Sequence, residues 1–274
     1  MTNRIATLPE DARARGAITL SAGNAGQAYA WAGSAAGVPV TVVMPEGAVR
    51  SKVEACLGYG ARVILHGQHV GDTVAEMRRI RDAEGLTFVH PFDDPQVIAG
   101  NGTVGLEIVD DVPDVDVVVV GVGGGGLISG IASAVKARRP EARVIGVEPD
   151  RSNAMTLAHE RGEIVTIQPE SVADGLGAPF AGRWTLAITR RLLDGIVLLD
   201  DPTILAGMRF ALERLKQVVE PAGAAALAAV LAGRIPLVDG ERVVVVVSGG
   251  NVEVGRLGKL LAAAGSLPGE PARG

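Results

Sequence analysis

The chain has 274 residues, of which 47% are hydrophobic and 21% are charged, and its formal net charge is −5. This length allows one large domain or two modest ones, and neither the acidic charge nor the scatter of basic residues favours nucleic acid or an anionic membrane as a partner. The longest apolar runs, such as residues 115–122, are too short to cross a bilayer. The first residues lack the apolar stretch of a signal peptide, so we expect a cytoplasmic protein.

Short β-branched runs alternate with longer helical stretches along the chain. The predicted strands are residues 17–20, 40–44, 62–65, 87–89, 116–122, 143–148, 196–199 and 242–247. The predicted helices are residues 24–36, 50–57, 71–84, 96–110, 127–138, 203–216, 222–232 and 252–264. Because the strands are continuous apolar runs, both of their faces should be covered, which favours parallel α/β sheets.

The single cysteine, Cys56, cannot form an internal disulfide or a thiolate metal cluster. Free cysteine is usually a small buried residue, and we expect that of Cys56 on its predicted helix.

Three turns follow predicted strands and carry the residues of chemical interest. They are Ser21-Ala22-Gly23-Asn24, the glycine-rich residues 121–127, and Ser248-Gly249-Gly250-Asn251. Ligands of open α/β sheets bind beyond the carboxyl ends of the strands, so each turn is a candidate binding element.

The glycine-rich turn is a candidate anion site, because glycines allow close backbone approach and the following helix offers unpaired N–H groups. It also matches the dinucleotide fingerprint through Gly121, Gly123 and Gly126, with Glu148 at the end of the next strand. An NAD-dependent oxidoreductase is therefore one alternative. It leaves the other two turns without a role.

The three turns, in this order and at these spacings, resemble the fold-type II pyridoxal-phosphate (PLP) family. That family includes threonine/serine dehydratase (threonine ammonia-lyase) and serine racemase. The resemblance covers essentially the whole chain, and further stretches that fit it are residues 43–46, 52–55, 90–94, 98–103, 146–149, 173–175 and 219–224.

The resemblance implies an α/β fold with two parallel-sheet three-layer domains of the tryptophan synthase β-like kind, the N-terminal part missing. It implies a small mobile substrate domain of residues 18–92. Residues 1–17 plus 93–265 would form the large PLP-binding domain, and residues 266–274 a frayed tail.

The same resemblance assigns roles to individual residues. The PLP phosphate would be held by Gly123, Gly124, Gly125, Gly126 and Leu127. Asn24 would hydrogen-bond the ring hydroxyl, and Ser248 the pyridine nitrogen. The substrate carboxylate would be bound by Ser21 with the N–H groups of Gly23 and Asn24. The implied activity is that of an ammonia-lyase converting L-threonine, L-serine or a related β-hydroxy amino acid to a 2-oxo acid and ammonia, in a possible homodimer.

The chain departs from the family's pattern at two places, the first turn and a possible cation site. Serine racemases tend to carry a second serine where this chain has Ala22, so elimination is favoured over racemisation. The divalent cation of some relatives would need Glu148, the Ser152 carbonyl and the side chain at Ala154. One carboxylate is a poor site for such an ion, so no metal is expected.

The family's Schiff-base lysine should lie shortly before the first turn, and its position falls upstream of Met1. None of the four lysines in the sequence is a plausible replacement, because that lysine must be desolvated and aimed at the cofactor. We therefore expect the 274-residue chain itself to be inactive. The alternative is a non-catalytic relative that binds PLP or an amino acid.

Overall fold

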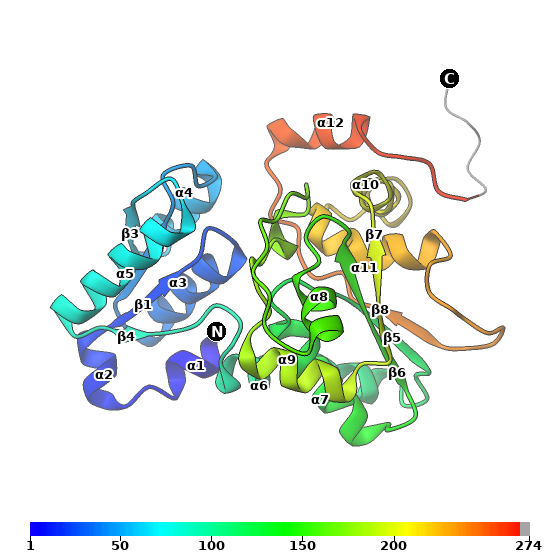
Figure 1. Ribbon diagram of the computed structural model, residues 1–274, viewed down its shortest axis with the longest axis horizontal. Helices are drawn as coiled ribbons and strands as arrows, with labels where there is room; N and C mark the ends of the chain where they lie inside the picture. Colours follow the sequence, from blue (N-terminus) through cyan, green and yellow to red (C-terminus); the bar gives the residue numbers. More distant parts are fainter. Residues whose placement is uncertain (269–274) are drawn as a thin grey trace. The chain divides into compact units, whose positions relative to one another are not determined.

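The computed structural model describes residues 1–268, which pack as two compact units (Figure 1). One unit is Met1–Gly100 and the other begins at Asn101. Within residues 1–268, no helix has both the length and the hydropathy that crossing a membrane requires.

The first unit is built on a four-stranded parallel sheet with the order β3-β2-β1-β4. Its elements are α1 (Thr2–Ala6), α2 (Glu10–Arg15), β1 (Ala17–Leu20), α3 (Asn24–Ala36), β2 (Val40–Met44), α4 (Arg50–Gly58), β3 (Arg62–Leu65), α5 (Val70–Glu84) and β4 (Thr87–Phe88). Helix α6 (Pro95–Asp111) crosses from this unit into the next.

Alternate residues of the central strands of this sheet face different helices. Ala17 and Val42 pack with Tyr29 of α3 and Cys56 of α4. Ile18 packs instead against α5. The covered faces confirm the layered arrangement expected from the continuous apolar strands. Cys56 has no exposed surface, and burial raises the pKa of its thiol to about 11, so it is an inert core residue.

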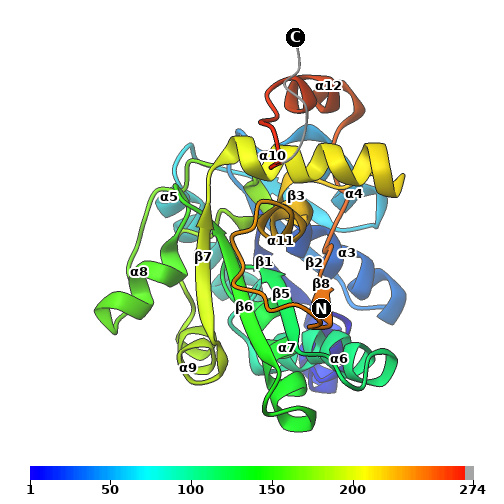
Figure 2. The ribbon, with the colours of Figure 1, turned by 90° about the vertical axis from the view of Figure 1, so that its right-hand side faces the viewer.

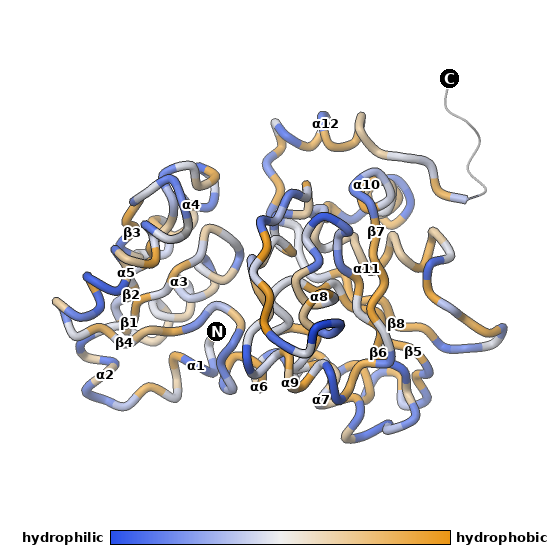
Figure 3. Tube along the Cα trace, viewed as in Figure 1, coloured by the Kyte–Doolittle hydropathy of each residue, from blue (hydrophilic) through white to orange (hydrophobic). Residues whose placement is uncertain are grey.

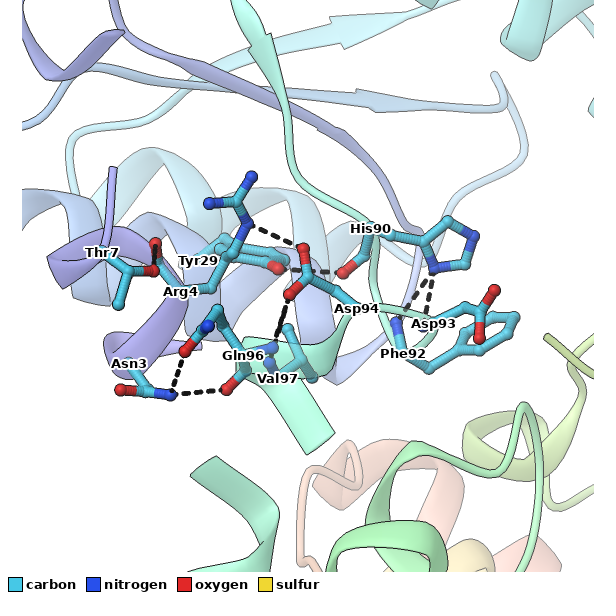
Figure 4. Close-up of polar contacts among 10 residues, drawn as sticks. All are labelled: Asn3, Arg4, Thr7, Tyr29, His90, Phe92, Asp93, Asp94, Gln96 and Val97. Carbon is cyan, nitrogen blue, oxygen red and sulfur yellow. Dashed lines mark hydrogen bonds and ion pairs between the residues drawn. The ribbon is translucent and has the colours of Figure 1, made fainter. Parts of the chain in front are cut away.

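The N-terminal segment packs in the first unit. Ile5, Leu8 and Ala12 belong to the same core cluster as α3 and β2. Polar contacts hold it as well (Figure 4): Arg4 forms an ion pair with Asp94 at 2.7 Å, and the Asn3 amide donates to the Gln96 carbonyl at 2.8 Å. The apolar contacts thus join residues 1–17 to α3 and β2, while the polar contacts join them to residues 94 and 96. The expected grouping of residues 1–17 with residues 93–265 stays a prediction.

The apolar side of the N-terminal helices fills the space beside α3. At the other end, Leu267 is buried, whereas a frayed tail was expected from residue 266. Residues 269–274 lie outside the described residues. Which segment moves on substrate binding, residues 18–92 or another, stays a prediction.

The second unit is built on a parallel sheet with the order β7-β6-β5-β8. Its elements are β5 (Val117–Gly121), α7 (Gly126–Arg138), β6 (Arg143–Pro149), α8 (Ala154–Arg161), a 3-10 turn (Asp174–Leu176), α9 (Arg183–Leu192), β7 (Gly195–Leu199), α10 (Asp201–Phe210), a π-helical turn (Ala211–Leu215), α11 (Pro221–Leu231), β8 (Val243–Val245) and α12 (Val254–Ala262). Figure 2 shows β5, β6 and β7 side by side.

Strand β5 is the centre of this unit, and both of its faces are covered. Val118 and Val120 pack in a cluster with α7, α8 and α9. Val117 and Val119 pack in another cluster with α10 and α11. In Figure 3 β5 and β8 lie at the hydrophobic end of the colour scale, as their valines require.

All the predicted strands are present, with ends that differ by a few residues at most. Helices α8 and α9 lie in residues 149–195, where the sequence analysis proposed no helix. The predicted helix of residues 203–216 is divided, because its last part widens into the π-helical turn.

Candidate functional site

The glycine-rich turn connects β5 to α7 within the second unit. Gly125 precedes the first helical residue and has φ +88°, a conformation that favours glycine. The first N–H groups of an α-helix have no partner inside the helix, and they carry the positive end of its dipole. Gly123, Gly124 and Leu127 are partly exposed. The turn therefore offers backbone N–H donors to an anion at the start of α7.

The glycines of this turn are required by close approach. A Cβ atom at Gly123 would lie 3.0 Å from the Leu176 Cα atom. A Cβ atom at Gly125 would lie 2.4 Å from the Met155 Cε atom and 2.9 Å from the Thr185 Cβ atom. A side chain at Gly123 would thus displace the Leu176 backbone, and one at Gly125 would displace the side chains of Met155 and Thr185.

Helix α9 contacts the turn through Thr185. The Thr185 hydroxyl donates to the carbonyl oxygen of Gly124 at 2.7 Å and accepts from the N–H of Gly182 at 2.9 Å. Thr185 has no exposed surface. The sequence analysis missed this residue, because it lies 61 positions after its partner and threonine within a helix carries no distinctive pattern.

The Ser248 turn begins beside the glycine-rich turn. Strands β5 and β8 are paired neighbours, with Val117 opposite Val243 and Val119 opposite Val245. The Val246 N–H continues this ladder by donating to the Val119 carbonyl at 3.0 Å. Both turns therefore leave the carboxyl edge of one sheet from adjacent strands, as the sequence analysis expected. The Ser248 side chain is exposed there.

The turn at Ser248 is also fixed from α11. The Glu220 N–H donates to the Gly249 carbonyl at 3.0 Å. A Cβ atom at Gly223 would lie 2.3 Å from the Gly249 oxygen. The backbone next to Ser248, the predicted contact of the pyridine nitrogen, is thus closely packed against the start of α11.

The Ser21 turn lies in the first unit, between β1 and α3. The Ser21 hydroxyl oxygen accepts hydrogen bonds from the N–H groups of Gly23 at 3.2 Å and Gly26 at 3.1 Å. The hydroxyl proton can still donate to a ligand. The Gly23 N–H, which was predicted to bind a substrate carboxylate, is used within the turn.

Glu148 is fully buried at the end of β6, and its carboxylate holds the start of α8. Its oxygens accept from the N–H of Met155 at 2.9 Å and from the N–H and hydroxyl of Thr156 at 2.8 and 2.6 Å. Burial raises the pKa of Glu148 to about 7, against the lowering effect of these donors. A carboxylate so engaged does not serve as a ribose ligand, which weakens the dinucleotide alternative.

The four lysines occupy varied surroundings. Lys136 forms an ion pair with Asp194 at 2.9 Å, and Lys216 donates to the Glu213 carbonyl at 2.7 Å. Lys259 is exposed on α12. Lys136 has 17% of its side chain exposed. Lys52 is buried in α4.

Comparisons with known proteins agree with the geometry. The family described as "Pyridoxal-phosphate dependent enzyme" matches residues 1–249. The chain is 41% identical over 260 residues to the catabolic L-threonine dehydratase TdcB of Escherichia coli (strain K12), covering 94% of this chain and 79% of that protein. It is 42% identical over 260 residues to the L-threonine ammonia-lyase of Thermotoga maritima, with coverage of 94% and 64%.

A solved structure shares the fold over most of its length. Maize serine racemase superposes with a TM-score of 0.89 at 34% identity, covering 95% of this chain and 80% of that chain. The expected class of two parallel-sheet α/β domains is therefore confirmed.

Proposed function

The chain belongs to the pyridoxal-phosphate dependent enzyme family, and from this premise we propose that it is the PLP-binding part of an L-threonine or L-serine ammonia-lyase. PLP is its cofactor and its reaction class is that of a lyase. The names of its relatives, catabolic L-threonine dehydratase and L-threonine ammonia-lyase, support threonine as a substrate.

The observation that carries this proposal is the pair of turns at one sheet edge. The glycine-rich turn supplies backbone donors at a helix start, and the Ser248 turn leaves the adjacent strand. Gly123 and Gly125 cannot carry a Cβ atom without displacing their neighbours. The residues present therefore fit a phosphate group held by backbone N–H groups, with a hydroxyl close by for a ring nitrogen.

When bound, PLP supplies an electron-withdrawing ring that favours loss of the α-proton of an amino acid. In the proposed arrangement, residues 123–127 hold its phosphate, Ser248 contacts its ring nitrogen and Asn24 its ring hydroxyl. A serine hydroxyl leaves the nitrogen largely unprotonated, which suits a reaction whose leaving group departs from the β-carbon. Ser21 would donate its hydroxyl proton to the substrate carboxylate.

The overall proposed reaction releases ammonia. The amino acid loses its α-proton and β-hydroxyl as water, and water then replaces the nitrogen, leaving a 2-oxo acid. Alanine at position 22 cannot transfer a proton, which supports elimination over racemisation. A homodimer and a cytoplasmic location remain part of the proposal.

Product analysis on the natural protein that contains this sequence tests the activity. With PLP, we expect L-threonine and L-serine to give 2-oxobutanoate and pyruvate, each with one equivalent of ammonia. D-amino acid formation without ammonia would contradict the proposal.

A second experiment asks whether any lysine of this chain bonds to the cofactor. Borohydride reduction of the 274-residue chain with PLP, followed by peptide mass mapping, should find no stoichiometric pyridoxyl adduct on Lys52, Lys136, Lys216 or Lys259. A stoichiometric adduct on one of them would identify that residue as the Schiff-base lysine and overturn the expectation that none of the four serves in that role.

A further inference from the structure

Thr185 lies directly beneath the glycine-rich turn and has a hydroxyl with a defined orientation. The oxygen accepts the hydrogen bond of the Gly182 N–H at 2.9 Å. Its single proton is left to donate, and the Gly124 carbonyl at 2.7 Å is closer than the Gly182 carbonyl at 3.3 Å. The buried hydroxyl therefore holds the Gly124 oxygen toward α9.

This contact determines where the next N–H group points. The carbonyl and N–H of one trans peptide unit point in opposite directions, because the unit is planar. No peptide bond of the described chain is cis. With the Gly124 oxygen held toward α9, the N–H of Gly125 is directed away from α9.

The side of the turn that faces α9 is already filled. The Met155 Cε atom and the Thr185 Cβ atom lie within 2.4 and 2.9 Å of where a Gly125 Cβ would be. The Gly125 N–H is directed away from this filled side, so an anion that binds it would approach from the side to which it points.

We infer that Thr185 is a positioning residue for the PLP phosphate: it never touches the cofactor, but orients the Gly125 N–H that does. This inference rests on the proposal that residues 123–127 hold the phosphate. It adds a residue of α9 to the determinants of cofactor affinity.

The experiment separates phosphate binding from stability by comparing two ligands. Dissociation constants of PLP and of pyridoxal, which lacks the phosphate, are measured by equilibrium dialysis for the 274-residue chain. The ratio of the pyridoxal constant to the PLP constant reports the contribution of the phosphate alone.

Three variants are compared with the unsubstituted chain. Thr185→Val keeps the shape and removes the hydroxyl, and Thr185→Ser keeps the hydroxyl. Thr189→Val is the control, since Thr189 is equally buried one turn later in α9. Its hydroxyl contacts His159, Met155 and Leu186, whereas that of Thr185 contacts Gly124 of the turn. Thr185→Ala replaces Thr185→Val if the latter does not fold.

Loss of the orienting hydrogen bond should lower the ratio of the two dissociation constants about tenfold in Thr185→Val. The substitution should weaken the binding of PLP and leave that of pyridoxal unchanged. Thr185→Ser and Thr189→Val should stay within about threefold of the unsubstituted chain. Competition by inorganic phosphate should weaken in parallel with the ratio.

An unchanged ratio in Thr185→Val, or an equal fall in Thr189→Val, would overturn the role of Thr185. A ratio near one in the unsubstituted chain would instead show that the turn does not bind the phosphate, and would overturn the proposed site together with the inference.

Discussion

The hydroxyl of Thr156 donates a 2.6 Å hydrogen bond to Glu148, a carboxylate with no exposed surface. Glu148 ends a strand and Thr156 begins a helix, so the contact joins β6 to α8. Helix α8 carries Met155, which packs under Gly125 of the glycine-rich turn. Buried Glu148 thus supports the candidate phosphate site indirectly, through Met155 of α8.

Glu148 should make stability depend on pH. Its folded pKa is about 7 against 4.5 in the unfolded chain, so the folded protein retains a proton that the unfolded chain releases. The folded state therefore loses stability as pH rises from about 4.5 to about 7. In Glu148→Gln, the loss between these limits should be smaller by on the order of 3 kcal/mol.

Urea unfolding of both proteins across this pH range measures the effect. Comparing the two slopes cancels the other titrating groups, because only Glu148 differs. Parallel pH profiles would show that Glu148 ionises normally.

The Gly125→Ala substitution should destabilise the second unit. It combines a left-handed φ of +88° with a Cβ that would overlap Met155 and Thr185. Gly240→Ala is the matched control, because Gly240 has φ +91° and a Cβ atom there would meet no other atom within 4 Å. The control should cost about 1–2 kcal/mol and Gly125→Ala about 1–3 kcal/mol more in unfolding free energy. Equal losses would mean that the packing beneath the turn yields easily.

Tyr29→Phe should destabilise the first unit. The Tyr29 hydroxyl donates to the His90 carbonyl at 2.8 Å (Figure 4). Tyr29 is buried and His90 is partly buried. The substitution leaves the carbonyl unsatisfied, at a cost of about 1–3 kcal/mol in unfolding free energy. Tyr59, which is 42% exposed, provides the control, and Tyr59→Phe should change stability by less than about 0.5 kcal/mol. A Tyr29→Phe variant as stable as its control would show that water replaces the hydroxyl.

Ser248→Ala should weaken PLP binding if its hydroxyl contacts the ring nitrogen. One lost hydrogen bond corresponds to an increase of about three- to tenfold in the dissociation constant. Ser133→Ala serves for comparison, since that hydroxyl donates to the Ser129 carbonyl on the same helix at 2.7 Å. Fluorescence titration with PLP gives both constants. Unchanged affinity in Ser248→Ala would remove Ser248 from the proposed site.

Much of the fold could be predicted because burial on both faces leaves a direct mark in the sequence. The run of valines in β5 has to fill two clusters, one under α7 and one under α11. The glycines at 123 and 125 were equally visible, since close packing permits no side chain there. Local composition determined these features.

Contacts between distant segments could not be predicted in the same way. The hydrogen bond from Thr185 to Gly124 depends on how α9 packs beneath the turn. The packing of Ile5 beside α3 depends on a surface that helix periodicity alone does not reveal. Helix α9 begins after Gly182, which has no side chain to cap it, and the cap comes instead from Thr185, whose hydroxyl accepts from the Gly182 N–H.

The most direct test of the account is the response of the backbone amides of residues 123–127 to three ligands, followed by ¹⁵N–¹H NMR. PLP and inorganic phosphate should both shift these signals, and pyridoxal should leave them in place. Shifts of equal size with pyridoxal, or no shift with PLP, would contradict the assignment of this turn as the phosphate site.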